Sequence, residues 1–151
     1  MPNFTRALRW VLTQEGVKFD AAWNVLDPGY VNDPRDPGGE TKFGISKKAN
    51  PDLNVKELTY DEASAIYRTR YWDANGCDQL EDGMALFIFD SAVQHGPMLV
   101  AALRKVSIAD GIWARLKYYT KLPTFSVFGR GWTKRLVDLR STLRYDYGAK
   151  V

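Results

Sequence analysis

The chain of 151 residues has one cysteine, Cys77, and one histidine, His95. A single cysteine excludes an internal disulfide framework, and a single histidine excludes an HExxH zinc site or a multi-histidine metal cluster. The motifs GxxxxGK[ST], GxGxxG and GxSxG are absent, which excludes the usual phosphate-binding loops and the nucleophile elbow. We therefore expect chemistry that depends on carboxylates and hydroxyls, without a metal or a cofactor.

Long hydrophobic runs are also missing. No segment approaches the ~20 apolar residues that span a bilayer, and charged residues interrupt the first twenty positions, where a signal peptide needs an apolar core. We expect a protein made in the cytoplasm without a signal peptide or stable membrane insertion. Hydrophobic residues make up 45% of the chain and charged residues 26%, which predicts one globular domain over residues 1–151.

Positive charge is scarce in the first two thirds of the chain and abundant in the last third. Residues 1–100 hold ten Lys/Arg against fifteen Asp/Glu, a net of −5, whereas residues 101–151 hold eleven against three, a net of +8. A basic segment favours a polyanionic partner, such as an anionic wall polymer or nucleic acid, and it is also typical of a solvated helix surface. No nucleic-acid-binding motif accompanies it, so we expect no nucleic-acid partner.

Apolar periodicity predicts a mainly α-helical fold. The first helix ends at Gly16, and a capping box of Thr59 and Glu62 begins a second helix. Residues 82–95 are apolar nearly all round, as in a central buried helix. Three further helices are predicted at 98–107, 108–121 and 131–146, and they form the basic C-terminal part, 98–151. Residues 17–45 are rich in Pro, Gly and Asp, which predicts turns and a small hairpin after the first helix, without the ligand spacing of a calcium-binding EF-hand.

Four polar residues on these helices are candidates for function. Glu15 lies on the apolar stripe of the first helix, in its last turn, where burial and the helix dipole favour the protonated acid that general-acid catalysis requires. The alternative is a glutamate at a frayed end that turns to solvent. Asp90 and Gln94 lie four residues apart on one face of the central helix, and they either have partners in the core or line a wet cleft. His95 ends that helix and is expected to be a cap or core residue, with a Cys77–His95 nucleophilic pair as the alternative.

One longer string makes the chain recognisable. Residues 29–46 read GYVNDPRDPGGETKFGIS, and they follow the Glu15–Gly16 pair that ends the first helix. Three further segments come in the same order: YRTRYWD at 67–73, FDSAVQHGP at 89–97 and LKYYTKLPTFSVFGRGWTKR at 116–135. Together they resemble glycoside hydrolase family 108, the family of phage endolysins and bacterial N-acetylmuramidases.

The resemblance implies a lysozyme-like α-helical fold and hydrolysis of the β-1,4 bond between N-acetylmuramic acid and N-acetylglucosamine. It assigns the general acid to Glu15. It matches Asp36 and Thr41 with an Asp and a Thr that hold the attacking water or stabilise the developing cation, and Asp33 is the competing second carboxylate. Because the separation of the two carboxylates decides between inversion and retention, the stereochemistry stays open.

Further substrate contacts are expected from residues in the matching segments, since aromatic faces pack on sugar rings and polar groups bond sugar hydroxyls. These residues are Tyr30, Asp33, Trp72, Asp90 and Gln94.

The chain departs from the family pattern in three places. Residues 17–28 are an insertion between the acid and the Gly-Tyr string, and they must loop out without moving either end. The pair Gln94–His95 replaces the more frequent Asn-Gln, and the region 98–114 is short, without a separate peptidoglycan-binding segment.

We therefore predict an endolysin-type muramidase. It would act on peptidoglycan as a monomer in the cell wall, and it would reach the periplasm through a holin-type pore if it is a phage protein. The alternative is a catalytically impaired peptidoglycan-binding or virion structural protein.

Overall fold

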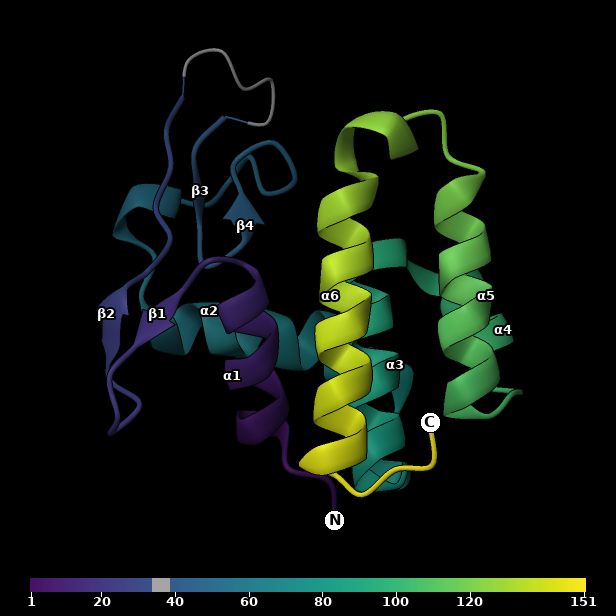
Figure 1. Cartoon of the computed structure of the whole chain (residues 1–151). Helices are drawn as coiled ribbons and strands as arrows, with labels where there is room; N and C mark the ends of the chain where they lie inside the picture. Colours follow the sequence, from purple (N-terminus) through teal and green to yellow (C-terminus); the bar gives the residue numbers. More distant parts are fainter. Residues whose placement is uncertain (34–38) are drawn as a thin grey trace. The chain divides into compact units, whose positions relative to one another are not determined.

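The computed structural model describes residues 1–33 and 39–151, in which helices predominate (Figure 1). The chain divides into two compact units. The hairpin unit is Phe4–Arg70, and the helical unit comprises Met1–Asn3 with Tyr71–Val151. The mainly α-helical prediction is confirmed, whereas the single domain over residues 1–151 stays a prediction.

Among its described residues, the hairpin unit contains two α-helices, one short 3-10 helix and two short hairpins. Its elements in chain order are α1 (Phe4–Gln14), β1 (Lys18–Phe19), β2 (Val25–Asp27), β3 (Thr41–Lys42), β4 (Ile45–Ser46), η1 (Val55–Glu57) and α2 (Tyr60–Tyr67). The helix α1 buries an apolar stripe, and α2 begins with the predicted capping box, in which Thr59 Oγ1 accepts from the Glu62 N–H and a Glu62 carboxylate oxygen accepts from the Thr59 N–H. Both the first helix and the capping box are thus confirmed.

Each hairpin is a pair of antiparallel strands, β1 with β2 and β3 with β4. Between β3 and β4 the chain turns at Phe43 and Gly44, which both have positive φ, at 53° and 74°. Two positive φ values are what a tight two-residue hairpin turn requires, and they strain any residue other than glycine. Phe43 is held there because its side chain is buried and its N–H donates to the Pro28 carbonyl at 2.9 Å.

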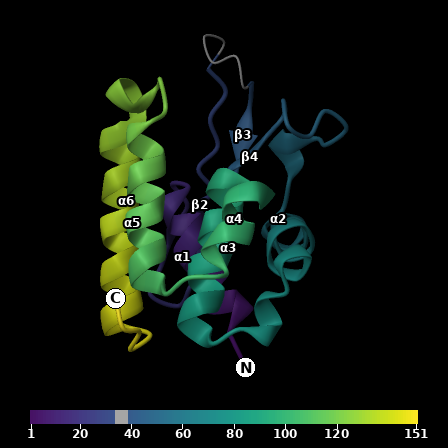
Figure 2. The same cartoon turned by 90° about the vertical axis from the view of Figure 1, so that its right-hand side faces the viewer.

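The helical unit is organised around one buried helix (Figures 1 and 2). The π-helical turn η2 (Arg68–Trp72) contains the division between the units, and η3 (Asp73–Asn75) and η4 (Cys77–Gln79) follow it. The longer helices are α3 (Asp82–His95), α4 (Pro97–Leu103), α5 (Ile108–Thr120) and α6 (Phe125–Tyr145). α3 matches its predicted bounds, contacts α4 and α6, and is buried nearly all round.

The last helix begins earlier than expected, at Phe125 rather than at residue 131. The added turns contain Gly129 and Gly131, although glycine lowers helix propensity. The Phe125 ring, however, lies over Gly129, where an added Cβ would come within 2.6 Å of it. This contact of residues four apart supports the first turn of α6.

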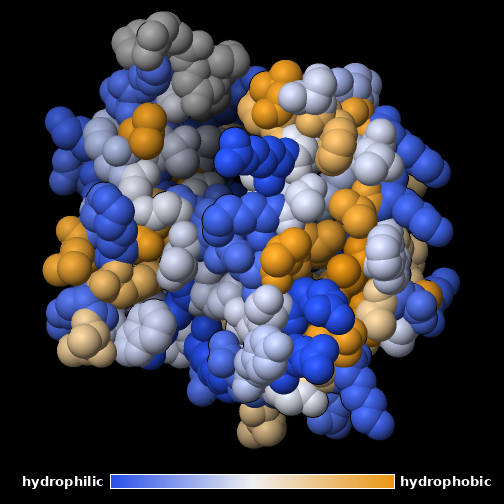
Figure 3. Space-filling model, viewed as in Figure 1, coloured by the Kyte–Doolittle hydropathy of each residue, from blue (hydrophilic) through white to orange (hydrophobic). Residues whose placement is uncertain are grey.

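Apolar side chains gather over α5 and α6 on the face seen in Figure 3. They line an open groove of about 300 Å³, in which Trp113 is 62% exposed and Val137 is 58% exposed. In the part of the chain that the structure describes, no helix combines the length and the apolar character needed to cross a membrane.

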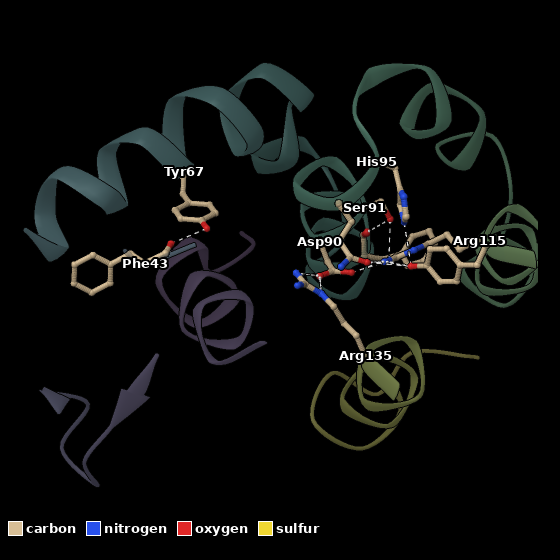
Figure 4. A network of polar contacts seen from close by, with 10 residues as sticks. Phe43, Tyr67, Asp90, Ser91, His95, Arg115 and Arg135 are labelled. Carbon is tan, nitrogen blue, oxygen red and sulfur yellow. Dashed lines mark hydrogen bonds and ion pairs between the residues drawn. The ribbon is translucent and has the colours of Figure 1, made fainter. Parts of the chain in front are cut away.

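An ion-pair cluster at the centre of the helical unit joins three helices (Figure 4). Asp90 of α3 accepts from Arg115 of α5 through Oδ2 at 2.7 Å and from Arg135 of α6 through Oδ1 at 2.7 Å. The Asp90 and Arg115 side chains are 0% exposed. Burial opposes ionisation of Asp90, but the two guanidinium groups outweigh it and lower the pKa of the carboxyl. Both carboxylate oxygens of Asp90 thus have partners in the core, which is one of the two alternatives from the sequence, and its contact with substrate stays a prediction.

Removing the Asp90 carboxylate should be costly because it strands two buried guanidinium groups. We expect Asp90→Ala to lower the free energy of unfolding by about 3–5 kcal/mol, measured by urea unfolding followed by circular dichroism. The matched control is Asp138→Asn, which breaks the exposed Lys134–Asp138 pair on α6 and should cost less than about 0.5 kcal/mol. Equal losses in the two variants would contradict the structural role of Asp90.

Candidate functional site

Glu15 lies directly after α1, where two backbone contacts fix its position. Its N–H lies 3.0 Å from the carbonyl oxygens of both Val11 and Leu12, and the chain then reverses at Gly16, with φ of 89°. The predicted helix end at Gly16 is therefore confirmed, because only glycine adopts this conformation without strain. The Glu15 side chain is half-buried.

The turn of the second hairpin packs against the Glu15 side chain. A Cβ added to Gly44 would lie 2.8 Å from Glu15 Cγ and 2.7 Å from the Tyr67 hydroxyl oxygen. That hydroxyl donates to the Phe43 carbonyl at 2.9 Å, so α2 supports the turn from its other side (Figure 4). The acid, the β3–β4 turn and α2 thus form one packed site inside the hairpin unit.

The predicted insertion, residues 17–28, leaves the packing of Glu15 against the β3–β4 turn undisturbed. It contains the β1–β2 hairpin, and Gly29 returns the chain to within 3.3 Å, measured from an added Cβ, of the Gly16 carbonyl. Trp23 at its tip packs on Phe19, with ring centroids 5.6 Å apart, and Arg9 of α1 lies 4.9 Å above the Trp23 ring. Trp23 therefore packs onto the hairpin unit while keeping 49% of its surface exposed.

Thr41 belongs to the β3–β4 hairpin, and Tyr30 precedes this hairpin in the chain. Thr41 is half-buried in β3, and its N–H and carbonyl pair with Val31. The Tyr30 hydroxyl donates to Glu40 at 3.0 Å, and this bond to a carboxylate raises the pKa of the phenol. Asp33 is half-buried, and Asp36 lies outside the described residues.

The remaining predicted contacts belong to the helical unit. Trp72 is fully buried, its indole N–H donates to Asp78 at 2.7 Å, and its ring packs edge-on against Phe89. This environment suits a core residue and leaves no ring face for a sugar. Gln94, in contrast, is half-buried at the end of α3, where its Oε1 accepts from Arg115 at 3.1 Å and from Tyr119 at 3.0 Å.

His95 shares this network. Its Nε2 lies 3.1 Å from the Tyr119 hydroxyl, and its ring packs against Tyr118 and Tyr119. Burial lowers the pKa of His95 to about 4, and the Arg115 charge adds to the effect. His95 and Cys77 are both in the helical unit, but Cys77 is fully buried in η4, which does not suit a nucleophile.

Two comparisons identify the family. The model of glycosyl hydrolase family 108 matches residues 8–96, more than half of the chain, including α1 from Leu8 on, both hairpins and α3. The chain belongs to glycosyl hydrolase family 108. It is also similar to the solved structure of Brucella abortus SagA, with 31% identity and a TM-score of 0.69 over 93% of this chain and 92% of that one. None of the curated proteins matches it.

Membership in family 108 supports a glycosidase, and the lysozyme-like fold prediction is confirmed. The match covers the whole hairpin unit from Leu8 onward, so Glu15 and Thr41 lie within it. It ends at Gly96, so Tyr119, which bonds Gln94 and His95, lies outside it.

Sequence reasoning missed three residues around these sites. Gly44 and Tyr67 pack at Glu15, and Tyr119 joins Gln94 to His95. Gly44 and Tyr67 both lie inside the quoted strings, so their positions were visible but their contacts were not. Nothing in the pattern of the last third distinguishes Tyr119 from the neighbouring Tyr118.

Adding one methyl group at Gly44 should displace the Glu15 side chain. We expect Gly44→Ala to reduce glycosidase activity at least ten-fold and to lower the free energy of unfolding by more than 1 kcal/mol, because both a clash and a positive φ oppose it. Gly39→Ala is the matched control, since Gly39 has φ of 70° but only an ordinary contact of 3.7 Å. Activity on purified sacculi and urea unfolding measure the two effects, and equal activity of the two variants would contradict the contact.

The single histidine offers a direct titration. His95 should stay neutral until about pH 4, whereas in the unfolded chain it takes up a proton near the ordinary pKa of 6.5. The unfolded state then binds more protons, so stability should fall as pH drops from about 6.5 to about 4. The His95 ring resonances give the midpoint by NMR, and His95→Gln should lose this part of the pH dependence in urea unfolding. A midpoint near 6.5 would be the contrary result.

Proposed function

We propose that the chain is a muramidase that hydrolyses the β-1,4 bond between N-acetylmuramic acid and N-acetylglucosamine in peptidoglycan, with Glu15 as the general acid. The observation that carries this proposal is the packing of Glu15 against the Gly44 turn, inside the family-108 match. The carboxyl group sits on a helix end fixed by backbone contacts, beside a hairpin that bears Thr41.

The reaction requires an acid and an opposing water or anion. Glu15 protonates the glycosidic oxygen as the bond to the sugar C1 breaks, and the ring carbon develops positive charge. Thr41 together with Asp36 or Asp33 holds the attacking water or stabilises that charge. Thr41 supports this role because it is only half-buried and belongs to the hairpin that contacts Glu15.

The biological role follows from this substrate. We propose an endolysin that acts as a monomer on the cell wall and that, if it is a phage protein, is released through a holin-type pore. The β1–β2 hairpin favours an active enzyme over an impaired binder, since the insertion rejoins the chain at Gly16 and leaves the contact of Glu15 with Gly44 in place.

Glu15→Gln keeps the size of the side chain and removes the acid. We expect clearing of purified sacculi to fall at least about 100-fold, with no change in thermal unfolding beyond a few degrees. Mass spectrometry should find reducing-end muramic acid only in the wild-type digest. Asp33→Asn and Asp36→Asn, assayed alongside, identify the second carboxylate as the one with the larger loss.

Glu57→Gln is the matched control, because Glu57 is an exposed glutamate of the same unit in η1. It should clear sacculi at the wild-type rate. Near-full activity of Glu15→Gln would exclude the proposed mechanism. Folded wild-type protein that binds sacculi without clearing them would instead indicate a peptidoglycan-binding protein.

A further inference from the structure

The helical unit contains a small pocket at the end of α3, between the adjoining ends of α5 and α6. It has a volume of about 150 Å³ and is lined by Gln94, His95, Tyr118, Tyr119, Leu122 and Trp132. All six residues belong to the helical unit, whereas Glu15 and Thr41 belong to the hairpin unit. Four of the six lie beyond residue 96, outside the part of the chain that matches the family.

Aromatic rings form the walls of this pocket. Tyr119 and Trp132 have ring centroids 5.5 Å apart at an interplanar angle of 36°, and Trp132 continues onto Phe128 at 5.9 Å. Tyr118 packs edge-on against His95 and is 39% exposed. Such ring faces pack against the C–H groups and methyl groups of a ligand.

The hydrogen bonds beside the pocket determine which nitrogen of the His95 ring carries the proton. Arg115 donates to both Gln94 Oε1 and the Tyr119 oxygen. The Tyr119 hydroxyl in turn donates to Gln94 Oε1. With the Tyr119 proton assigned to Gln94, the 3.1 Å contact of His95 Nε2 with the Tyr119 oxygen assigns the ring proton to Nε2. Because the pKa of His95 is lowered to about 4, the ring is neutral near pH 7 and its Nδ1 is an acceptor.

Four polar groups of the pocket keep unused bonding capacity. Within residues 1–33 and 39–151, no side chain or backbone group bonds the Gln94 amide N–H₂, His95 Nδ1, the Trp132 indole N–H or the Tyr118 hydroxyl. A ligand can therefore meet a donor at Gln94 and an acceptor at His95, next to an aromatic wall at Trp132. This arrangement matches a secondary amide, which carries one carbonyl, one N–H and an apolar substituent.

Nearby charge selects against cations. The groups that face His95 are the ring of Tyr118, the hydroxyl of Tyr119 and the buried cluster in which two guanidinium groups, of Arg115 and Arg135, surround the single carboxylate of Asp90. This surplus positive charge disfavours a metal ion or an amine in the pocket. No group of histidine, cysteine and carboxylates suited to a metal occurs among the described residues.

From these features we propose that the pocket binds the acetamido group of an N-acetylated hexosamine. Gln94 donates to the acetamido carbonyl, His95 Nδ1 accepts from its N–H, and the methyl group packs on Trp132. The inference rests on the proposed function, because it deepens that function by adding a recognition site for a sugar of the same polymer.

The test uses Glu15→Gln protein, so that the probe is not hydrolysed. Isothermal titration with triacetylchitotriose should give saturable binding, and cellotriose, which has a hydroxyl in place of each acetamido group, should bind at least ten-fold more weakly. The His95 ring resonances should shift with the acetylated trimer alone. Equal affinity for the two trimers, or no binding of the acetylated trimer, would overturn the proposal.

Two variants locate the site. His95→Gln keeps an N–H donor toward Tyr119 but removes the Nδ1 acceptor, and it should weaken binding about three- to ten-fold. Trp132→Ala removes the wall and should weaken binding about ten-fold, with Trp132→Phe as the milder variant if alanine destabilises α6. Trp113→Ala is the matched control, because Trp113 is an exposed tryptophan on the other groove of the same unit.

The results separate the two proposals. Loss of binding in His95→Gln and Trp132→Ala, without loss in Trp113→Ala, supports the pocket even if the wild-type protein fails to clear sacculi. Unchanged binding in both pocket variants overturns the pocket, and clearing that depends on Glu15 would then leave the muramidase proposal intact.

Discussion

The interaction on which the helical unit depends is the Asp90 carboxylate between two guanidinium groups. It ties α3 to α5 and α6 through three buried side chains, of which only Arg135 keeps any exposure, at 8%. The hydrogen-bond network extends from this cluster toward the surface. Arg115 also donates to Gln94 and Tyr119, and Tyr119 contacts His95. A stabilising core contact therefore also fixes the orientation of polar groups at the surface.

The hairpin unit depends on a different constraint, which is glycine at three positions where a side chain would be strained or would clash. Gly16 ends α1, Gly29 approaches it, and Gly44 makes room for Glu15. At each position the backbone adopts a positive φ, and at Gly29 and Gly44 a neighbour lies where a Cβ would be. Glu15 is positioned by close backbone packing, because a side chain at Gly44 would collide with it.

Local patterns in the sequence predicted the local structure well. The first helix, the capping box of Thr59 and Glu62 and the buried α3 all follow from periodicity and capping chemistry, which act within a few residues. The partners of Asp90 did not follow, because Arg115 and Arg135 lie 25 and 45 residues away and no local signal selects them from the other basic residues. The same limit explains Trp72, an aromatic residue whose burial depends on distant packing. Helical position singled out Glu15, and the family resemblance added Asp36 and Thr41, while the roles of all three residues remain predictions.

The close approach of Gly29 to Gly16 makes the β1–β2 hairpin a closed loop. Its two ends lie side by side, so the entropy of closing the loop depends only weakly on how many residues lie between them. Evolution can therefore lengthen, shorten or exchange this hairpin without refolding α1. Such a change leaves Glu15 and its contact with Gly44 in place.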